Sequence, residues 1–154
     1  MNWSSFIPDL VIAVIGAALA VSVALWTYFR QLRLKNLQAV RNLADDLSMR
    51  RAFVPVAPVE GLGGDAERCF LSVQAAQQRI AQIRDEIAPD HELRAELQQL
   101  VLACVVYKSR VEVEPQRWLF ALMSLRGELV TGLHRIEELL KLPSRSLPEP
   151  GTAQ

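Results

Sequence analysis

The chain contains one long apolar block, Leu10–Phe29, which reads LVIAVIGAALAVSVALWTYF. These 20 residues include no charged side chain. A helix rises about 1.5 Å per residue, so the block would span roughly 30 Å, the thickness of the hydrocarbon core of a bilayer. A helix in a soluble core normally keeps a polar face, and this block has none. We therefore predict a single transmembrane helix over 10–29, preceded by a short external N-terminus over 1–9.

The charges on the two sides of this block differ in sign. Residues 1–9 contain one Asp and no Lys or Arg, whereas Arg30, Arg33 and Lys35 directly follow the block. Because positively charged flanks remain in the cytoplasm, we predict that the N-terminus lies outside the cell membrane and the C-terminal part lies in the cytoplasm. The same three cations are candidates for contact with lipid headgroups.

A cleaved signal peptide is the alternative interpretation of the block, and Ala18-Leu19-Ala20 resembles a cleavage site. A signal peptide, however, has a basic N-terminal region and a shorter apolar core. Here the N-terminal region is acidic and the core is long, which favours a retained anchor.

Three small residues within the block, Gly16, Ala20 and Ala24, recur every four residues. Such spacing places them on one helix face, where small side chains let two membrane helices approach closely. They are candidates for self-association in the membrane. The block has no ionisable side chain, so it gives no support to a transporter or a proton relay.

The segment 30–53 has neither Gly nor Pro, so we expect the membrane helix to continue into it as a juxtamembrane helix. Its apolar stripe consists of Leu37, Val40, Leu43 and Leu47. The next segment, 54–64, contains two Pro and three Gly, which predicts a linker.

Three further helices are predicted over 65–142, and each shows the 3-4 spacing of a heptad seam. Asp65 is the expected N-cap of the first, Pro89 ends it, and Pro115 is expected at the first helical position of the third. The seam residues are Ala66, Cys69, Val73, Ala76, Ile80, Ile83 and Ile87; Leu93, Leu97, Leu100, Cys104, Tyr107 and Val111; and Trp118, Leu122, Leu125, Leu129, Gly132, Ile136 and Leu139 or Leu140.

The middle helix, from about Asp90 to Val113, carries apolar residues beyond its seam. Leu102, Val105 and Val106 widen its apolar surface. We expect this helix to be the most buried of the three, unless the extra width is an interface with another subunit.

The fold class is therefore all-α. Short links between helices favour antiparallel neighbours, so we predict a three-helix antiparallel cytoplasmic bundle over 65–142. Whether the juxtamembrane helix packs beside it as a fourth helix is left open. The tail, 143–154, is rich in Pro and Ser and is predicted to be disordered.

The charged and reactive residues favour no particular chemistry. Lys and Arg together number 17, as do Asp and Glu, and this zero net charge argues against nucleic acid as the partner. His91-Glu92 lacks the second His of a zinc protease motif, and the two cysteines form no metal-binding pattern. We assign no catalytic residue, no metal site and no cofactor, and expect a protein that is not an enzyme.

The start of the third helix is a candidate partner surface, formed by Arg117, Trp118 and Phe120. The leading hypothesis is a membrane-anchored helical module that binds a protein partner or itself at the cytoplasmic face, with membrane lipids as its surroundings. Two alternatives are an oligomerising membrane-disrupting effector or toxin, and an accessory subunit of a membrane enzyme.

Overall fold

The computed structural model describes residues 3–50, 52–53, 64–87, 89–143 and 147, with side chains from Ile12 onward. All regular elements in these residues are helical: α1 (Trp3–Met49), α2 (Asp65–Glu86), α3 (His91–Val113), the 3₁₀ turn η1 (Pro115–Arg117) and α4 (Trp118–Leu140). The predicted all-α class is confirmed. The chain divides into two compact units, Met1–Asn36 and Leu37–Gln154.

The first unit contains the N-terminal part of α1, whose apolar side chains are exposed. Ile12, Leu19 and Phe29 are 68%, 62% and 63% exposed. By length and composition this helix can cross a membrane, since its apolar window has a mean hydropathy of 2.0 and none of it is buried. The helix begins at Trp3, before the predicted boundary at Leu10, because hydropathy marks where apolar side chains begin rather than where helical hydrogen bonding begins.

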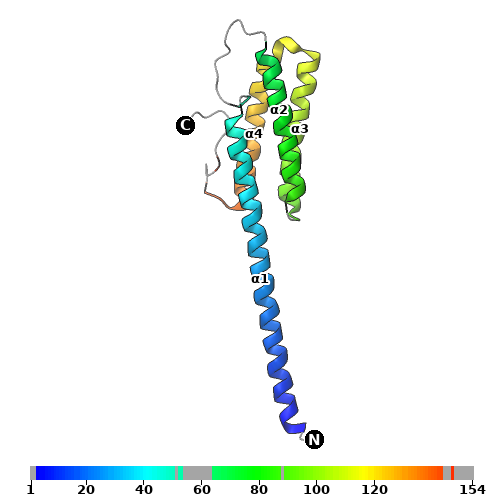
Figure 1. The fold of residues 1–154 in the computed structure, drawn as a ribbon, viewed down its shortest axis with the longest axis vertical. Coiled ribbons are helices and arrows are strands. Elements are labelled where there is room, and N and C mark those ends of the chain that lie inside the picture. Colours follow the sequence, from blue (N-terminus) through cyan, green and yellow to red (C-terminus); the bar gives the residue numbers. More distant parts are fainter. Residues whose placement is uncertain (1–2, 51, 54–63, 88, 144–146, 148–154) are drawn as a thin grey trace. The chain divides into compact units, whose positions relative to one another are not determined.

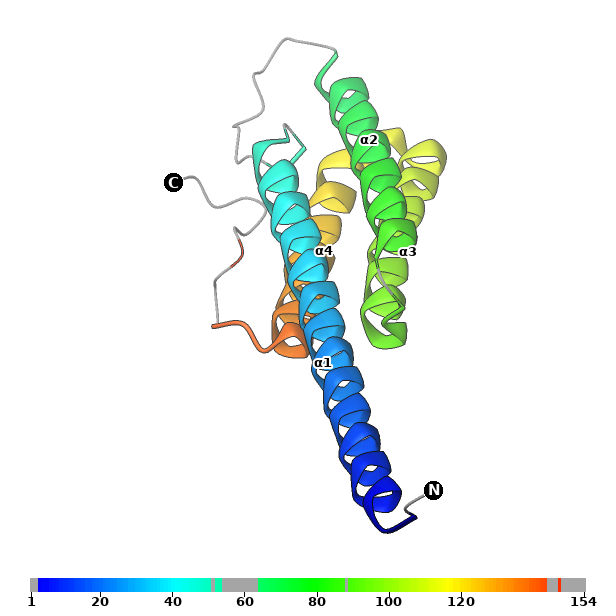
Figure 2. The ribbon, with the colours of Figure 1, turned by 60° about the horizontal axis from the view of Figure 1, so that its bottom comes forward.

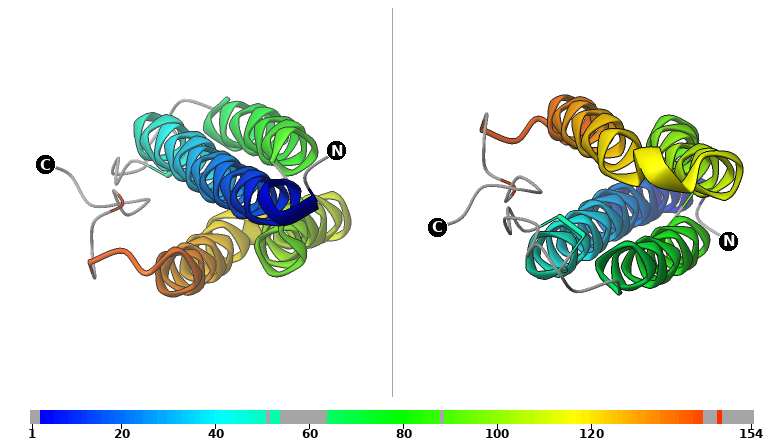
Figure 3. Two further views of the ribbon diagram at one scale, coloured as in Figure 1. Left: turned by 90° about the horizontal axis from the view of Figure 1, so that it is seen from below. Right: turned by 90° about the horizontal axis from the view of Figure 1, so that it is seen from above.

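The second unit is an up-down-up-down bundle of four helices. Residues 37–49 of α1, then α2, α3 and α4, alternate in direction (Figures 1 and 2). Figure 3 views the bundle from its two ends and shows the four helices in cyclic order, so that the 37–49 segment neighbours α2 and α4 and lies diagonally across from α3. α3 packs along both α2 and α4.

The juxtamembrane segment is thus the fourth helix of the bundle, a question that the sequence left open. Its side chains Val40, Leu43 and Leu47 are fully buried in the common core. Beyond the end of α1, the Ala52 N–H donates to Ser72 Oγ of α2 at 3.3 Å. The Ala52 carbonyl accepts from Arg126 Nε of α4 at 2.9 Å. These bonds tie the end of α1 to two other helices.

The predicted heptad seams account for most of the core. Ala66, Val111 and Trp118 are half-buried at the seam ends, and Leu139 is exposed, so Leu140 is the seam residue. The buried seam positions are Cys69, Val73, Ala76, Ile80 and Ile83 in α2, with Ile87 directly after it; Leu93, Leu97, Leu100, Cys104 and Tyr107 in α3; and Leu122, Leu125, Leu129, Gly132, Ile136 and Leu140 in α4.

Helix boundaries differ slightly from those predicted. Gly64 is the N-cap of α2, and Asp65 is its first helical residue. There the Asp65 carboxylate interacts favourably with the positive end of the helix dipole. Asp90 caps α3, because its carboxylate accepts the Leu93 N–H at 3.1 Å. Pro115 begins the 3₁₀ turn rather than α4. The predicted linker lies outside the described residues except for Gly64.

Beyond the end of α4, Leu147 is hydrogen-bonded to Glu137 of that helix. Lys141 adopts a left-handed conformation with φ of 54°, which ends the helix. The buried Glu137 carboxylate accepts the Leu147 N–H at 2.8 Å, and Leu147 itself is only 4% exposed. The predicted disorder of 143–154 stays a prediction, since residues 144–146 and 148–154 lie outside the described residues.

Gly132 allows the close approach of α4 to α3. A Cβ built at Gly132 would overlap the Leu100 Cδ2 methyl, whereas a Cβ at Gly127 of the same helix would meet nothing within 4 Å. Alanine increases helix propensity at both sites by about 1 kcal/mol. Overpacking at the buried site costs about 1–3 kcal/mol. Because the gain in helix propensity is the same at both sites, the free energy of unfolding of Gly132→Ala should be lower than that of Gly127→Ala by the overpacking cost, about 1–3 kcal/mol. Urea unfolding measures both values, and equal values would contradict this packing.

Candidate interaction surface

The solvent-facing side of α3 carries a second heptad stripe that has no charge. Its positions are spaced alternately four and three residues apart, and all are exposed. Leu102, Val106 and Val113 are 44%, 47% and 77% exposed. We call this set the outer stripe of α3: Ala95, Gln99, Leu102, Val106, Ser109 and Val113.

The exposure of this stripe corrects the expectation that α3 would be the most buried helix. Leu102, Val105 and Val106 were expected to widen the apolar surface of this helix, either in the core or as an interface with another subunit, and each is more than 40% exposed. Successive residues of a helix are about 100° apart. Leu102 and Val106 lie two positions from Cys104 and therefore face away from the seam, whereas Val105 lies one position from Cys104, on the flank of the helix. Uncharged residues at heptad spacing on a solvent-facing side are typical of a helix that packs on two sides.

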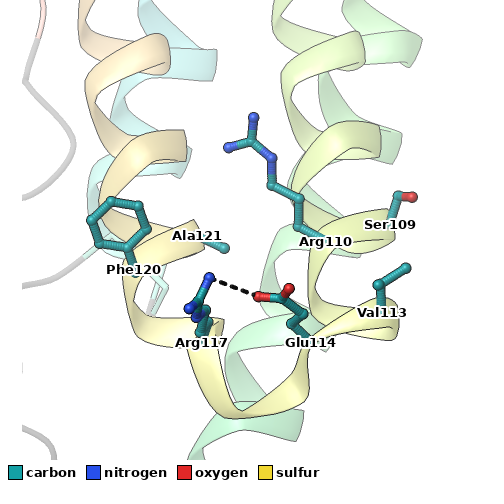
Figure 4. A pocket seen from close by; sticks show the side chains of 7 residues that line it. All are labelled: Ser109, Arg110, Val113, Glu114, Arg117, Phe120 and Ala121. Carbon is teal, nitrogen blue, oxygen red and sulfur yellow. Dashed lines mark ion pairs between the residues drawn. The ribbon is translucent and has the colours of Figure 1, made fainter.

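A groove between the end of α3 and the start of α4 adjoins the outer stripe. Figure 4 shows Phe120 on the α4 side, Val113 on the α3 side, and the Arg117–Glu114 ion pair between them, 3.1 Å from Nη1 to Oε2. The cavity has a volume of about 510 Å³. Its lining residues are Ser109, Arg110, Val113, Glu114, Arg117, Phe120 and Ala121.

A smaller cavity of about 170 Å³ continues the groove along the same helix pair. Arg110 and Ala121 line both cavities, so the two are adjacent. Tyr107 also lines the smaller one, and its hydroxyl has no hydrogen-bond partner among the described residues. Burial, and to a lesser extent the nearby Cys69 thiol, raises the pKa of Tyr107 to about 12. The ring therefore stays neutral at ordinary pH.

The structure brings two of the three predicted partner-surface residues together. Arg117 and Phe120 line the larger cavity, and Phe120 is 75% exposed. Trp118 is half-buried and packs against the core instead. The outer stripe of α3 was not among the predicted site residues. Its signal was present in the sequence, because the spacing from 95 to 113 repeats as regularly as the buried seam.

The candidate membrane residues lie in the first unit. Gly16, Ala20 and Ala24 are exposed, and space is open around Gly16 for a side chain. Arg30 and Lys35 are exposed, as is Arg33, and the Arg30 guanidinium lies 5.7 Å from the centre of the Trp26 ring, a cation–π distance. Self-association and headgroup contact by these residues stay predictions.

The buried thiols are poorly suited to nucleophilic chemistry. Cys104 is fully buried, and burial raises its pKa to about 12 despite the opposing effect of Lys108. A thiolate is the reactive species, so Cys104 is unreactive near neutral pH in the folded bundle. Cys69 is also buried.

Neither histidine lies in a group of side chains that could hold a metal ion. His134 Nδ1 lies 3.1 Å from Glu137 Oε2, and the same Glu137 carboxylate anchors Leu147 through its other oxygen. His91 is exposed at the start of α3. Among the described residues, no group of three or more His, Cys, Asp or Glu side chains is placed to hold a metal ion.

Comparison of the chain with protein-family models, with curated proteins and with solved structures gives no match. The exposed surface of the bundle and the apolar N-terminal helix are the features of the chain from which a function can be inferred.

Proposed function

We propose that this protein is a membrane-anchored helical module that binds a protein partner or a second copy of itself at the cytoplasmic face. The observation that carries this proposal is the outer stripe of α3. It extends from Ala95 to Val113 without a charged residue, and its three largest apolar side chains are 44–77% exposed. Large exposed apolar surface on a folded domain is typical of an interaction site.

The groove beside the stripe supports the same proposal. Phe120 and Val113 are among the most exposed apolar side chains of the bundle, at 75% and 77%. Aromatic residues at the edge of a cavity, with charged groups around them, are typical of protein interfaces. The Arg117–Glu114 pair supplies such charged groups at the rim.

The apolar N-terminal helix supports membrane anchoring, and the flanking charges support its orientation. A window of the helix with a mean hydropathy of 2.0 is entirely exposed, and water is a poor solvent for such a surface. The proposed orientation has the N-terminus outside and the bundle in the cytoplasm, since Arg30, Arg33 and Lys35 follow the span and residues 1–9 contain no Lys or Arg.

Cysteine accessibility in native membranes tests whether the stripe is covered. A cysteine at Val106 is expected to react slowly with a water-soluble maleimide, whereas one at Gln78, exposed on α2, is expected to react rapidly. Cys69 and Cys104 are buried and supply the background, measured on the unaltered chain. Equal labelling of Val106→Cys and Gln78→Cys would contradict the proposal.

A further inference from the structure

We propose that Trp26 and Arg30 of α1 form a binding site for the phosphate group of one anionic phospholipid. This inference rests on the membrane anchoring in the proposed function. It narrows the predicted headgroup contact from three cations to one of them, Arg30, and adds the aromatic ring beside it.

The two side chains lie on one face of α1. Residues four apart on a helix are neighbours, because successive residues are about 100° apart. Side chains on a helix also lean toward its N-terminus, which directs the Arg30 side chain back toward Trp26. The Arg30 guanidinium lies 5.7 Å from the centre of the Trp26 ring. The ring therefore holds the cation beside the end of the apolar block rather than farther along the helix.

The charge of Arg30 has no opposite charge near it on this helix. No Asp or Glu occurs between Asp9 and Asp45. Asp45 follows Arg30 by 15 residues, which is about 22 Å along a helix axis, and Asp9 is farther away. Trp26 and Arg30 are both exposed, Trp26 by 65%. The guanidinium therefore takes its counter-charge from the surroundings of the helix, and at a membrane surface these are the lipid headgroups.

The chemistry of the pair selects a phosphate that carries a net negative charge. A guanidinium donates two parallel N–H bonds to a phosphate, and the indole N–H of tryptophan is a further donor at the level where such rings favour the membrane interface. A zwitterionic phospholipid balances its phosphate with its own ammonium group, whereas phosphatidylglycerol does not. The site is therefore expected to prefer phosphatidylglycerol over phosphatidylcholine.

Native mass spectrometry of the full chain tests this preference. The chain is released in mild detergent from bilayers that contain equal amounts of the two lipids, and it is expected to retain mainly phosphatidylglycerol. Arg30→Gln is expected to lower the ratio of the two retained lipids roughly fivefold, the effect of one cation at a membrane surface. Trp26→Leu leaves the charge unchanged and is expected to lower the ratio too, because it removes the ring that positions the guanidinium.

The matched control exchanges two neighbouring residues, Arg30→Gln together with Gln31→Arg. The exchange keeps the composition and the net charge, and it moves the cation by about 100° around the helix, away from Trp26. Gln31 is exposed, so no packed core is disturbed. The exchanged chain is expected to show the low ratio of Arg30→Gln. The ratio of the unaltered chain would instead mean that net charge attracts the lipid, and would overturn the inference.

Two further results would overturn the inference. One is equal retention of both lipids by the unaltered chain. The other is release of phosphatidylglycerol by added inorganic phosphate, which indicates a site for the free anion. Alkaline carbonate extraction separates this inference from the proposed function. A chain that stays in the membrane without a lipid preference lacks only the lipid site, whereas a chain that carbonate removes from the membrane lacks the proposed anchor as well.

Discussion

Arginine at Leu19 and Val21 is expected to move the chain out of the membrane. Both residues lie at the centre of the apolar block and are 62% and 58% exposed, so the change disturbs no packed core. An arginine at the centre of a membrane helix disfavours insertion by about 2.5–3.5 kcal/mol. The pair should therefore lower the insertion equilibrium by roughly a thousandfold or more. The measurement is the fraction of chain that stays in the membrane pellet after alkaline carbonate extraction.

The matched control for this change is Gln38→Arg with Asn42→Arg. These two positions are exposed on the same helix, α1, and the change adds the same charge outside the apolar block. The control is expected to remain in the pellet. If the Leu19 and Val21 variant also remains there, the apolar block does not act as the anchor.

Aspartate at Leu43 is expected to unfold the bundle. Leu43 is fully buried in the core, in the segment of α1 that belongs to the second unit. An unpaired charge in such a site costs roughly 3–5 kcal/mol, a large part of the stability of a small domain. Because Cys104 is fully buried, the rate of its modification by a thiol reagent reports the opening of the core.

Asn42→Asp is the control, since it places the same residue one position away on the exposed side of the helix. Its effect on thiol reactivity is expected to be small, because surface substitutions change stability by about 0.5 kcal/mol or less. Equal reactivity of Leu43→Asp and Asn42→Asp would mean that the juxtamembrane segment is a stalk rather than the fourth helix of the bundle.

Heptad spacing was sufficient to predict the buried seams of α2, α3 and α4. It could not predict whether an apolar stripe is covered by the same chain. The stripe with Leu43 and Leu47 and the one with Leu102 and Val106 look equivalent as patterns, yet the first is buried in the bundle and the second is exposed. The difference depends on which helices surround each stripe, and periodicity carries no information on tertiary neighbours.

Single hydrogen bonds between residues far apart in the chain could not be predicted from the sequence either. The Glu137 carboxylate and the Leu147 N–H lie ten residues apart, across a helix end and a Pro-containing segment whose composition suggests disorder. The contact between Arg126 and Ala52 joins residues 74 positions apart. Composition describes the average behaviour of a segment, whereas such contacts depend on one donor and one acceptor meeting in the folded chain.

Light scattering of the detergent-extracted chain tests the central claim most directly, since it gives the protein mass of the assembly with and without an intact outer stripe. The unaltered chain is expected to exceed the 17.2 kDa of one copy, and Val106→Glu is expected to fall to it. Val106 is 47% exposed and glutamate is a good helix former, so the bundle itself should stay folded. Gln78→Glu on α2 should keep the full mass. An unaltered chain of 17.2 kDa, or a Val106→Glu variant that keeps the larger mass, would contradict self-association through the outer stripe.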